Sequence, residues 1–353
     1  MTMTVSNTLP VVDLSPFMGM EGCVTGDPPT EAQCRVAVQI DRIMREHGFL
    51  YLENFGVQEA EAAAAFDVSR RLFQGGPLAP YAPEKQRGHT KFGQENINRK
   101  RPKDLRESFS IKSRHVFSND YGGAPDDFAP TMDALWDKLE TASQRLMIAC
   151  ALAIGLPLEE LDFFARAHER GDGTAMRINH YPPCDFQPGV SDGSDGSGAI
   201  RIGEHADFGM FTFLLLEDGA PGLQVRKTAE GSASAAAAGD ASACEAAWIE
   251  APGRGGTCAI VNSGALLARW TNDRWRATAH RVVVTSAEEA EHHRYSIPFF
   301  VHPDHSAVIE THAHFLGNGD TPRYPPISGY DHVMSLVKGM QTSNQNPSRH
   351  AGA

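Results

Sequence analysis

The sequence predicts a layer of helices packed on a β-sandwich or barrel. Long segments with helical spacing of apolar residues dominate the first 156 residues. Short apolar strands punctuated by Gly and Pro follow them as far as residue 300. Helices followed by many short strands are typical of a helical layer on a closed or two-layered β-structure.

The first half predicts strands at its start and helices after them. Residues 9–17 form a short apolar run closed by prolines, which predicts an edge strand. In chain order we then expect a helix over 31–47 ended by Gly48, a buried strand over 49–52, a helix over 60–73, a loop over 78–105 and a long helix over 130–156.

The second half predicts seven strands and a final helix. The strands are expected at 175–180, 211–216, 223–225, 248–250, 258–262, 280–284 and 295–300, and the helix at 330–340. Two segments between strands, 187–198 and 228–243, are rich in Gly, Ser, Asp or Ala and resemble inserted loops. The chain contains no internal repeat.

Composition and charge exclude several classes of protein. The 353 residues are 41% hydrophobic and 22% charged, which is ordinary for a folded globular chain. A net charge of −12 disfavours binding to nucleic acid and to anionic membranes. No run approaches a membrane span, and no secretory leader is recognised. Six scattered cysteines predict free thiols in a reducing, cytoplasmic compartment.

Three side chains predict a metal site. His205 and Asp207 directly precede an apolar strand, and residues two apart on a strand share a face. His280 begins another apolar strand and supplies a third ligand. Two histidines and one carboxylate suit non-haem Fe(II) with open positions. A second His-x-Asp sequence, His302 to Asp304, has a central proline, and we assign it to a turn rather than to the metal.

A carboxylate clamp is predicted on the last strand. Arg294 and Ser296 are two residues apart, so their side chains share a face, and an Arg fork beside a hydroxyl suits a carboxylate. Asn179 and Tyr181 form a further pair at the same spacing, leading out of another strand. Taken alone, Arg294 would indicate a surface salt bridge, and the pair of Asn179 and Tyr181 would indicate a turn. Because both pairs occur together with the candidate metal ligands, they are stronger evidence for a binding site.

These motifs resemble the isopenicillin N synthase-like Fe(II)/2-oxoglutarate-dependent dioxygenases. The similarity extends over residues 9–340. It rests on the metal and clamp residues above and on the segments 9–14, 47–57, 104–109, 222–225 and 261–273. Within the family, the segments around His205, Trp270 and Arg294 are most similar to thymine 7-hydroxylase-type members.

The resemblance implies one catalytic domain over residues 1–353. It would be mainly β with supporting helices: a support region at 9–160, a double-stranded β-helix (jelly roll, cupin-like) at 175–310, and a C-terminal helix at 325–340. Iron would be held by His205, Asp207 and His280. 2-Oxoglutarate would bind Arg294 and Ser296.

The implied cofactors are Fe(II), 2-oxoglutarate and O2, with ascorbate expected to help in vitro. Asn179 and Tyr181 would lie at the iron-side end of 2-oxoglutarate. The implied reaction oxidises a C–H bond of a small-molecule metabolite, as in secondary metabolism, and releases succinate and CO2. Hydroxylation, desaturation and oxidative cyclisation all fit.

Five side chains are candidates for the substrate pocket, although such side chains are more often part of a core. They are Phe300, Phe92, His180, Phe208 and Phe109. Phe300 is the strongest, because its even offset from Arg294 places both on one face. The basic run 99–101 could meet a carboxylated substrate or form a solvated face, and the C-terminal helix could cover the mouth or only pack.

Two alternatives remain open from the sequence. An iron-dependent oxidase of the same fold could use the Arg-x-Ser pair for another anion, without 2-oxoglutarate. A non-enzymatic binding protein could use the jelly roll as a scaffold, although the complete set of metal ligands argues against it. Substrate-dependent release of succinate would distinguish the 2-oxoglutarate-dependent enzyme from the first alternative. O2 uptake with added iron would distinguish an enzyme from the non-enzymatic binding protein.

Overall fold

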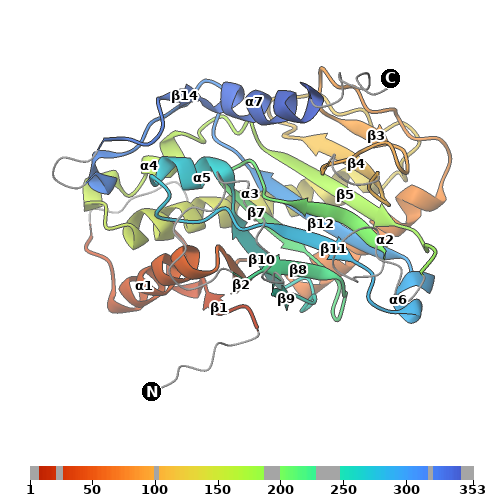
Figure 1. Cartoon of the computed structure of the whole chain (residues 1–353), viewed down its shortest axis with the longest axis horizontal. Helices are drawn as coiled ribbons and strands as arrows, with labels where there is room; N and C mark the ends of the chain where they lie inside the picture. The colour runs from red at the N-terminus through yellow and green to blue at the C-terminus, as the bar shows by residue number, and fades with distance from the viewer. Residues whose placement is uncertain are drawn as a thin grey trace, which may run out of the picture.

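The computed structural model describes residues 8–20, 27–98, 103–186, 199–227, 247–316 and 321–342. Its strands form two main sheets, shown in Figure 1. The major sheet has eight strands in the order β1-β2-β10-β7-β12-β5-β4-β3, and the minor sheet has four in the order β6-β11-β8-β9. A third, two-stranded sheet joins β13 and β14 near the C-terminus.

The strands of the major sheet come from both halves of the chain. They are β1 (Val11–Asp13), β2 (Phe49–Glu53), β3 (Gly88–Thr90), β4 (Glu107–Lys112), β5 (Ala175–Tyr181), β7 (Phe211–Leu215), β10 (Cys258–Ser263) and β12 (Arg294–Val301). The others are β6 (Ile200–His205), β8 (Leu223–Arg226), β9 (Trp248–Glu250), β11 (His280–Val283), β13 (Val308–Ile309) and β14 (Ile327–Ser328).

Helices from the first half of the chain cover the outer face of the major sheet. The described α-helices are α1 (Glu31–Glu46), α2 (Glu59–Gln74), α3 (Phe128–Ala153), α4 (Phe163–Arg166), α5 (Ala265–Trp270), α6 (Ala287–Glu291) and α7 (Gly329–Thr342). Three 3-10 helices occur at Ser15–Phe17, Leu158–Glu160 and Ala313–Phe315. Trp136 of α3 packs edge-on against Phe299 of β12, with ring centroids 4.9 Å apart, so α3 lies directly on the sheet.

Two hydrophobic cores divide the molecule into layers. The larger core lies between the helices and the outer face of the major sheet. The smaller core lies between the two sheets, where Tyr181 of the major sheet meets Leu223 and Val282 of the minor sheet. Because successive residues of a strand point to opposite faces, strands such as β2 and β10 contribute residues to both cores.

Local signals explain where the first helix begins and ends. Thr30 and Gln33 form a capping box, in which each side chain accepts a hydrogen bond from the other residue's backbone amide. Gly48 follows the helix with φ +67°, a conformation that favours glycine. A Cβ atom there would lie 2.6 Å from the Arg276 carbonyl oxygen, so glycine also permits the close approach of the segment that precedes β11.

Most predicted elements are confirmed, and the differences concern short elements. The four long helices and all seven strands predicted for the second half are present. β3 lies inside the predicted loop 78–105. The elements that were not predicted are the strands β4, β6, β13 and β14 and the short helices α4, α5 and α6. Only Val11–Asp13 of the predicted 9–17 strand is extended, pairing parallel to β2 at the sheet edge. The segments 99–101, 187–198 and 228–243 lie outside the described residues, and no helix among the described residues is long and apolar enough to cross a membrane.

Candidate metal centre and adjoining cavity

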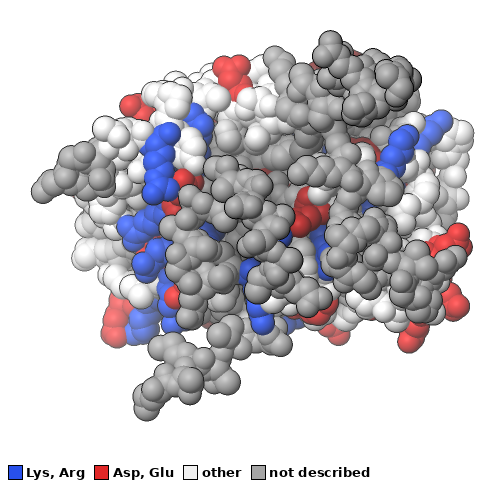
Figure 2. All heavy atoms as spheres, viewed as in Figure 1, with Lys and Arg blue, Asp and Glu red and all other residues white. Residues whose placement is uncertain are grey.

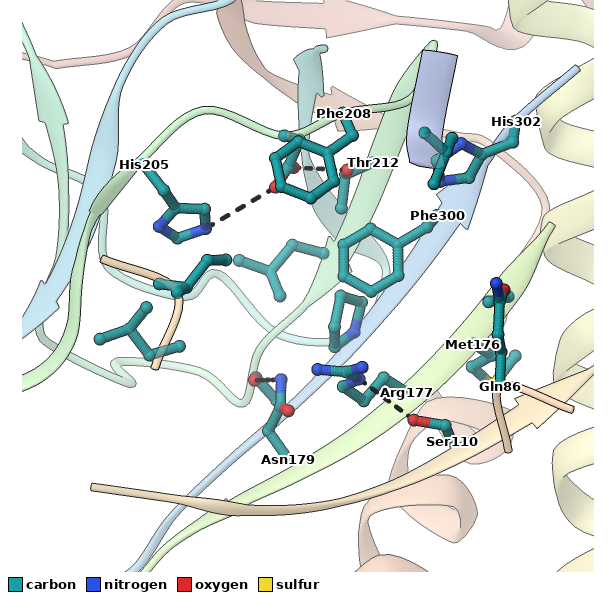
Figure 3. A pocket seen from close by; sticks show the side chains of 18 of the residues that line it. Gln86, Ser110, Met176, Arg177, Asn179, His205, Phe208, Thr212, Phe300 and His302 are labelled. Atoms are coloured by element: carbon teal, nitrogen blue, oxygen red, sulfur yellow. Dashed lines mark hydrogen bonds and ion pairs between the residues drawn. The ribbon is translucent and has the colours of Figure 1, made fainter. Parts of the chain in front are cut away.

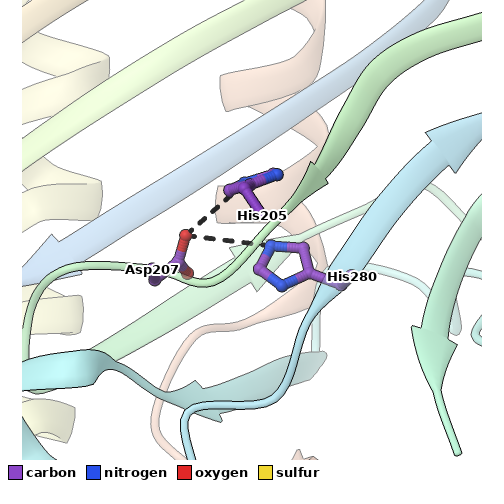
Figure 4. Close-up of side chains that lie close together, drawn as sticks. All are labelled: His205, Asp207 and His280. Atoms are coloured by element: carbon purple, nitrogen blue, oxygen red, sulfur yellow. Dashed lines mark ion pairs between the residues drawn. The ribbon is translucent and has the colours of Figure 1, made fainter. Parts of the chain in front are cut away.

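The three predicted metal ligands meet at one end of the minor sheet (Figure 4). His205 is the last residue of β6 and His280 the first of β11, and the two are paired across these antiparallel strands. Asp207 lies in the loop that follows β6. The Nε2 atoms of His205 and His280 are each 3.8 Å from Asp207 Oδ1. Ligand atoms of the three residues all lie within 4.8 Å of one another, so they could hold one metal ion.

Hydrogen bonds orient both histidines for metal binding. His205 Nδ1 lies 2.8 Å from the Gly203 carbonyl oxygen, and His280 Nδ1 lies 3.3 Å from the Thr278 carbonyl oxygen. A carbonyl only accepts, so each Nδ1 carries the proton and donates it. The Nε2 lone pairs are therefore left free to face Asp207, an arrangement that fixes the tautomer metal binding needs.

Asp207 is oriented by hydrogen bonds to only one of its oxygens. Its Oδ2 accepts hydrogen bonds from Thr212 Oγ1 at 2.6 Å and from Asn262 Nδ2 at 2.8 Å. Both donors stand on major-sheet strands, β7 and β10. Oδ1 is the oxygen that faces the two imidazoles, so the carboxylate is held with one oxygen toward the point where the three ligands meet.

The loop that carries Asp207 is held by the start of α5. The backbone amides of Ala265 and Leu266 donate to the carbonyl oxygens of Asp207 and Phe208, at 2.7 and 3.2 Å. Gly264 precedes them, and a Cβ there would lie 2.3 Å from the Gly209 carbonyl oxygen. The sequence-based reason for grouping His205 with Asp207, a shared strand face, was wrong, because the strand ends at His205 and the loop turns the carboxylate inward.

Burial and neighbouring groups set the protonation states of His205 and Asp207. Burial, reinforced by the neighbouring His280, lowers the pKa of His205 to about 3. Burial would raise the pKa of Asp207, but the two histidines and its two hydrogen-bond donors outweigh that effect and lower it. A neutral imidazole and an ionised carboxylate are the forms that bind a metal, and this donor set suits Fe(II).

Arg294 lies on the inner face of the major sheet, at the opposite end of β12 from Phe300, the residue paired with Thr212. It is buried, its Nε donates to the Pro221 carbonyl oxygen at 2.8 Å, and its guanidinium carbon lies 4.9 Å from the centre of the Tyr181 ring. Within the described part of the chain, Nη1 and Nη2 have no hydrogen-bond partner. Two buried donors fixed side by side fit a carboxylate, because such a group accepts both bonds of an Arg fork. Burial lowers the pKa of Arg294.

Ser296 and Asn179 stand beside this clamp. The two residues are paired across β12 and β5, and Asn179 Nδ2 donates to Ser296 Oγ at 3.1 Å. Arg294 is likewise paired with Tyr181. The structure therefore brings all four side chains together, since each pair occupies alternate positions of one strand.

Arg106 belongs to this site and was missed. Its Nη1 donates to Asn179 Oδ1 at 3.0 Å, and its Nη2 forms an ion pair with Glu95 at 2.9 Å. It immediately precedes β4, where Ser108 and Ser110 alternate with buried apolar residues. That alternation is the signal of a half-buried strand, and it would have placed Arg106 beside β5.

A cavity of about 790 Å³ adjoins the three ligands (Figure 3). Both sheets line it, together with Tyr330, Val333 and Met334 of α7, so the C-terminal helix forms part of its wall. Phe208 and Phe300 line it, as predicted, and Figure 3 shows their rings between His205 and His302. Thr212 and Asn262 also line it but were not predicted.

Three predicted substrate residues do not line the cavity. Phe92 is exposed, with 48% of its surface accessible, and Phe109 is buried in the core against Phe128 of α3. His180 faces the outer side of β5, because it alternates with Asn179 and Tyr181. The predictions for Phe109 and His180 were wrong because the sequence did not show which face of their strands is the inner one. Phe92 lies in the turn after β3, outside any strand.

His180 instead belongs to a hydrogen-bonded chain outside the cavity. Glu107 Oε1 lies 2.8 Å from His180 Nδ1, and its Oε2 lies 2.8 Å from His89 Nε2. His180 Nε2 also lies 2.7 Å from His293 Nδ1. Burial would raise the pKa of Glu107, but its two histidine partners outweigh that effect and lower it to about 2.

His302 lies closer to the site than the sequence indicated. It follows β12, as a turn residue should, but its side chain lines the cavity and its Nδ1 is buried without a hydrogen-bond partner. Burial lowers its pKa to about 3. The cluster of potential metal-binding groups among the described residues contains His205, Asp207 and His280, not His302.

Comparison with known proteins identifies the family. The sequence profile of the 2OG-Fe(II) oxygenase superfamily matches residues 173–303. The N-terminal profile of non-haem dioxygenases in morphine synthesis matches residues 9–126. Together the two matches contain the candidate metal ligands, the clamp and the helices α1 and α2 of the supporting layer.

Similar proteins extend over most of the chain. Proline hydroxylase buaE of Petromyces alliaceus is 30% identical over 296 residues, covering 78% of this chain and 84% of that protein. The 2-oxoglutarate-Fe(II) type oxidoreductase hxnY of Emericella nidulans is 27% identical over 350 residues, covering 93% and 89%. The thymine 7-hydroxylase of Neurospora crassa, solved with alpha-KG and thymine, has a TM-score of 0.74 and 25% identity, covering 95% and 98%.

The chain belongs to the 2OG-Fe(II) oxygenase superfamily. It is an Fe(II)- and 2-oxoglutarate-dependent dioxygenase that uses O2, and the convergent His, Asp and His side chains and the free Arg294 donors fit those cofactors. The predicted jelly-roll fold and the predicted resemblance to this family, including its thymine 7-hydroxylase-type members, are confirmed. The family assignment favours this enzyme over the two alternatives that the sequence left open.

Proposed function

We propose that His205, Asp207 and His280 bind the catalytic Fe(II), and that the enzyme oxidises a C–H bond of a small-molecule metabolite. The observation that carries this proposal is the convergence of three ligand atoms whose orientation is fixed before any metal binds. The bound iron supplies O2 activation coupled to decarboxylation of 2-oxoglutarate, with release of succinate and CO2. The outcome is a hydroxylation, a desaturation or an oxidative cyclisation.

Arg294 and Ser296 bind the distal carboxylate of 2-oxoglutarate in this proposal. The Nη1 and Nη2 atoms of Arg294 support it, because no described residue satisfies these buried donors. Asn179 and Tyr181 orient the cosubstrate from the neighbouring strand β5. Arg106 keeps Asn179 in place through its hydrogen bond to Oδ1.

The substrate occupies the remaining cavity, against Phe208 and Phe300. Both line the cavity beside the metal ligands, and the α7 residues Tyr330 and Met334 line it as well. A site walled by these side chains excludes water from the reacting centre, which limits side reactions of the activated oxidant.

Substrate-dependent formation of succinate tests the proposed function. The panel contains three classes of compound: nucleobases such as thymine; proline and its derivatives; and natural-product acids. Thymine and proline are included because one similar structure contains thymine and one relative is named a proline hydroxylase. We expect at least one class to raise the succinate rate above the uncoupled background, with matching O2 uptake. O2 uptake with substrate but without succinate would refute the 2-oxoglutarate-dependent reaction.

The chain acts as a single catalytic domain in the cytoplasm, on a small molecule rather than on nucleic acid or a membrane. The helical layer supports this proposal, because it shares one hydrophobic core with the major sheet. Four of the described cysteines are free thiols, as a reducing compartment favours. Basic and acidic side chains are interspersed over the described part of the face in Figure 2, without the broad basic surface typical of nucleic-acid binding.

A further inference from the structure

Lys112 is a buried cation in the wall of the cavity. It is the last residue of β4 and stands at an even offset from Ser110, so both side chains point to the inner face of the major sheet. Both residues line the cavity. Only 4% of the Lys112 surface is accessible. A buried ammonium is costly unless an anion or several acceptors compensate it.

The cavity contains two cations that lack a carboxylate partner. Four Arg and Lys side chains line it among the described residues. Arg106 and Arg177 share Glu95, with N–O distances of 2.9 and 3.0 Å. Arg294 has its free Nη atoms, which 2-oxoglutarate would satisfy. Lys112 Nζ donates to one neutral acceptor, the Gly173 carbonyl oxygen, at 3.2 Å, and a lysine ammonium has three donors.

The surroundings of Lys112 do not neutralise it. Asp172 attracts it from beyond ion-pair distance and already accepts a hydrogen bond from the His305 amide at 2.8 Å. Arg87 repels it, and the Phe117 ring lies 6.0 Å from its Nζ. Burial, the largest effect, lowers the pKa of Lys112 to about 8, so the side chain is still mainly charged at neutral pH.

The strand register places Lys112 at a defined distance from the metal ligands. Thr212, which donates a hydrogen bond to Asp207, is paired with Phe300 of β12. Phe300 is paired with Ala175 of β5, which in turn is paired with Lys112 of β4. These paired residues form a row across the four adjacent strands β7, β12, β5 and β4. Three strand spacings amount to about 14 Å, so a molecule of ordinary metabolite length can reach from the iron to Lys112.

We propose that Lys112 binds the acidic group of the substrate, and that the enzyme therefore oxidises an organic acid whose carboxylate lies at the end of the cavity remote from the reacting carbon. This inference rests on the proposed function for the position of the iron. Phe300 and Pro298, on the strand between, contact the apolar body of the acid. His302, also in the cavity wall, adds a polar group near the same end of β12.

Anaerobic calorimetric titration tests the inference without turnover. The enzyme carries Fe(II) and saturating 2-oxoglutarate, which fills the Arg294 site, and the probes are phenylalkanoic acids of four to eight chain carbons, each beside its primary amide. We expect at least one acid to bind wild-type enzyme about tenfold or more tightly than its amide. Lys112→Met should abolish that preference, and Lys112→Arg should restore part of it.

Control measurements separate this inference from the proposed function. Lys91→Met removes an exposed lysine and should leave the acid preference unchanged. The Kd of 2-oxoglutarate should stay within about twofold in Lys112→Met, because Arg294 holds it. Equal binding of acids and amides, binding of neither, or an acid preference that survives in Lys112→Met would overturn the inference. Failure of 2-oxoglutarate to bind any variant would instead refute the proposed cosubstrate site.

Discussion

Replacement of Arg294 by lysine is the most direct test of the proposed cosubstrate site. Arg294 Nε is already engaged by the Pro221 carbonyl oxygen, which fixes the plane of the guanidinium and leaves Nη1 and Nη2 for a ligand. Lysine offers a point charge without the planar fork. Binding of 2-oxoglutarate should therefore lose one of two charge-assisted hydrogen bonds, while the Pro221 carbonyl loses its donor.

The expected magnitude follows from one lost hydrogen bond. A hydrogen bond to a charged group contributes about 1.5–3 kcal/mol, which corresponds to roughly 10- to 100-fold in the Kd of 2-oxoglutarate. Anaerobic calorimetry with Fe(II)-loaded Arg294→Lys measures this Kd directly, and the KM from succinate formation should rise in parallel. Bound iron should remain unchanged, because Arg294 does not contact the metal ligands.

A matched control distinguishes ligand binding from a general cost of the substitution. Arg281 is also a buried arginine, on β11, where its Nε donates to Gln224 and its guanidinium stacks on Trp248. It does not line the cavity. Arg281→Lys should alter stability without changing the Kd of 2-oxoglutarate. An unchanged Kd in Arg294→Lys, or an equal change in both variants, would refute the assignment of Arg294.

Three further predictions concern the metal centre and the stability of the fold. His280→Ala should lose Fe(II) and turnover whereas His302→Ala keeps its iron; metal analysis giving the reverse would exclude the assigned ligands. Thr212→Val removes one of two hydrogen bonds that orient Asp207, so iron affinity should fall roughly 10- to 100-fold, and an unchanged iron titration would contradict this role. Glu107, whose pKa is lowered to about 2, stabilises the fold above about pH 4.5, and this contribution is lost as the pH falls toward 2. Glu107→Gln should therefore flatten the dependence of Tm on pH in that range; identical pH profiles would rule the contribution out.

The sequence alone predicted seven strands of the second half and a candidate metal site. Strands of the jelly roll are short, apolar and bounded by Gly or Pro, so local pattern is enough to find most of them. His205, Asp207 and His280 were identified as candidate metal ligands because each flanks such a strand. β4 was missed because charged residues precede it and mask the alternation of Phe109 with its serines.

The tertiary structure decided which face of each strand is functional. Asn179 and His180 are neighbours in sequence, yet one lines the cavity and the other binds Glu107 on the outer face. A single strand cannot specify this choice, because both of its faces are buried here, one under the helices and one between the sheets.

Long-range contacts also decided how the functional groups are held. Asp207 depends on donors from Thr212 and Asn262, and Lys112 reaches the cavity only through its pairing with β5. The sequence therefore determined which residues have the chemistry of an Fe(II) and 2-oxoglutarate site. Only the folded sheets decided their distances, their protonation states and the unpaired charge of Lys112, because burial and strand register depend on residues far apart in the chain.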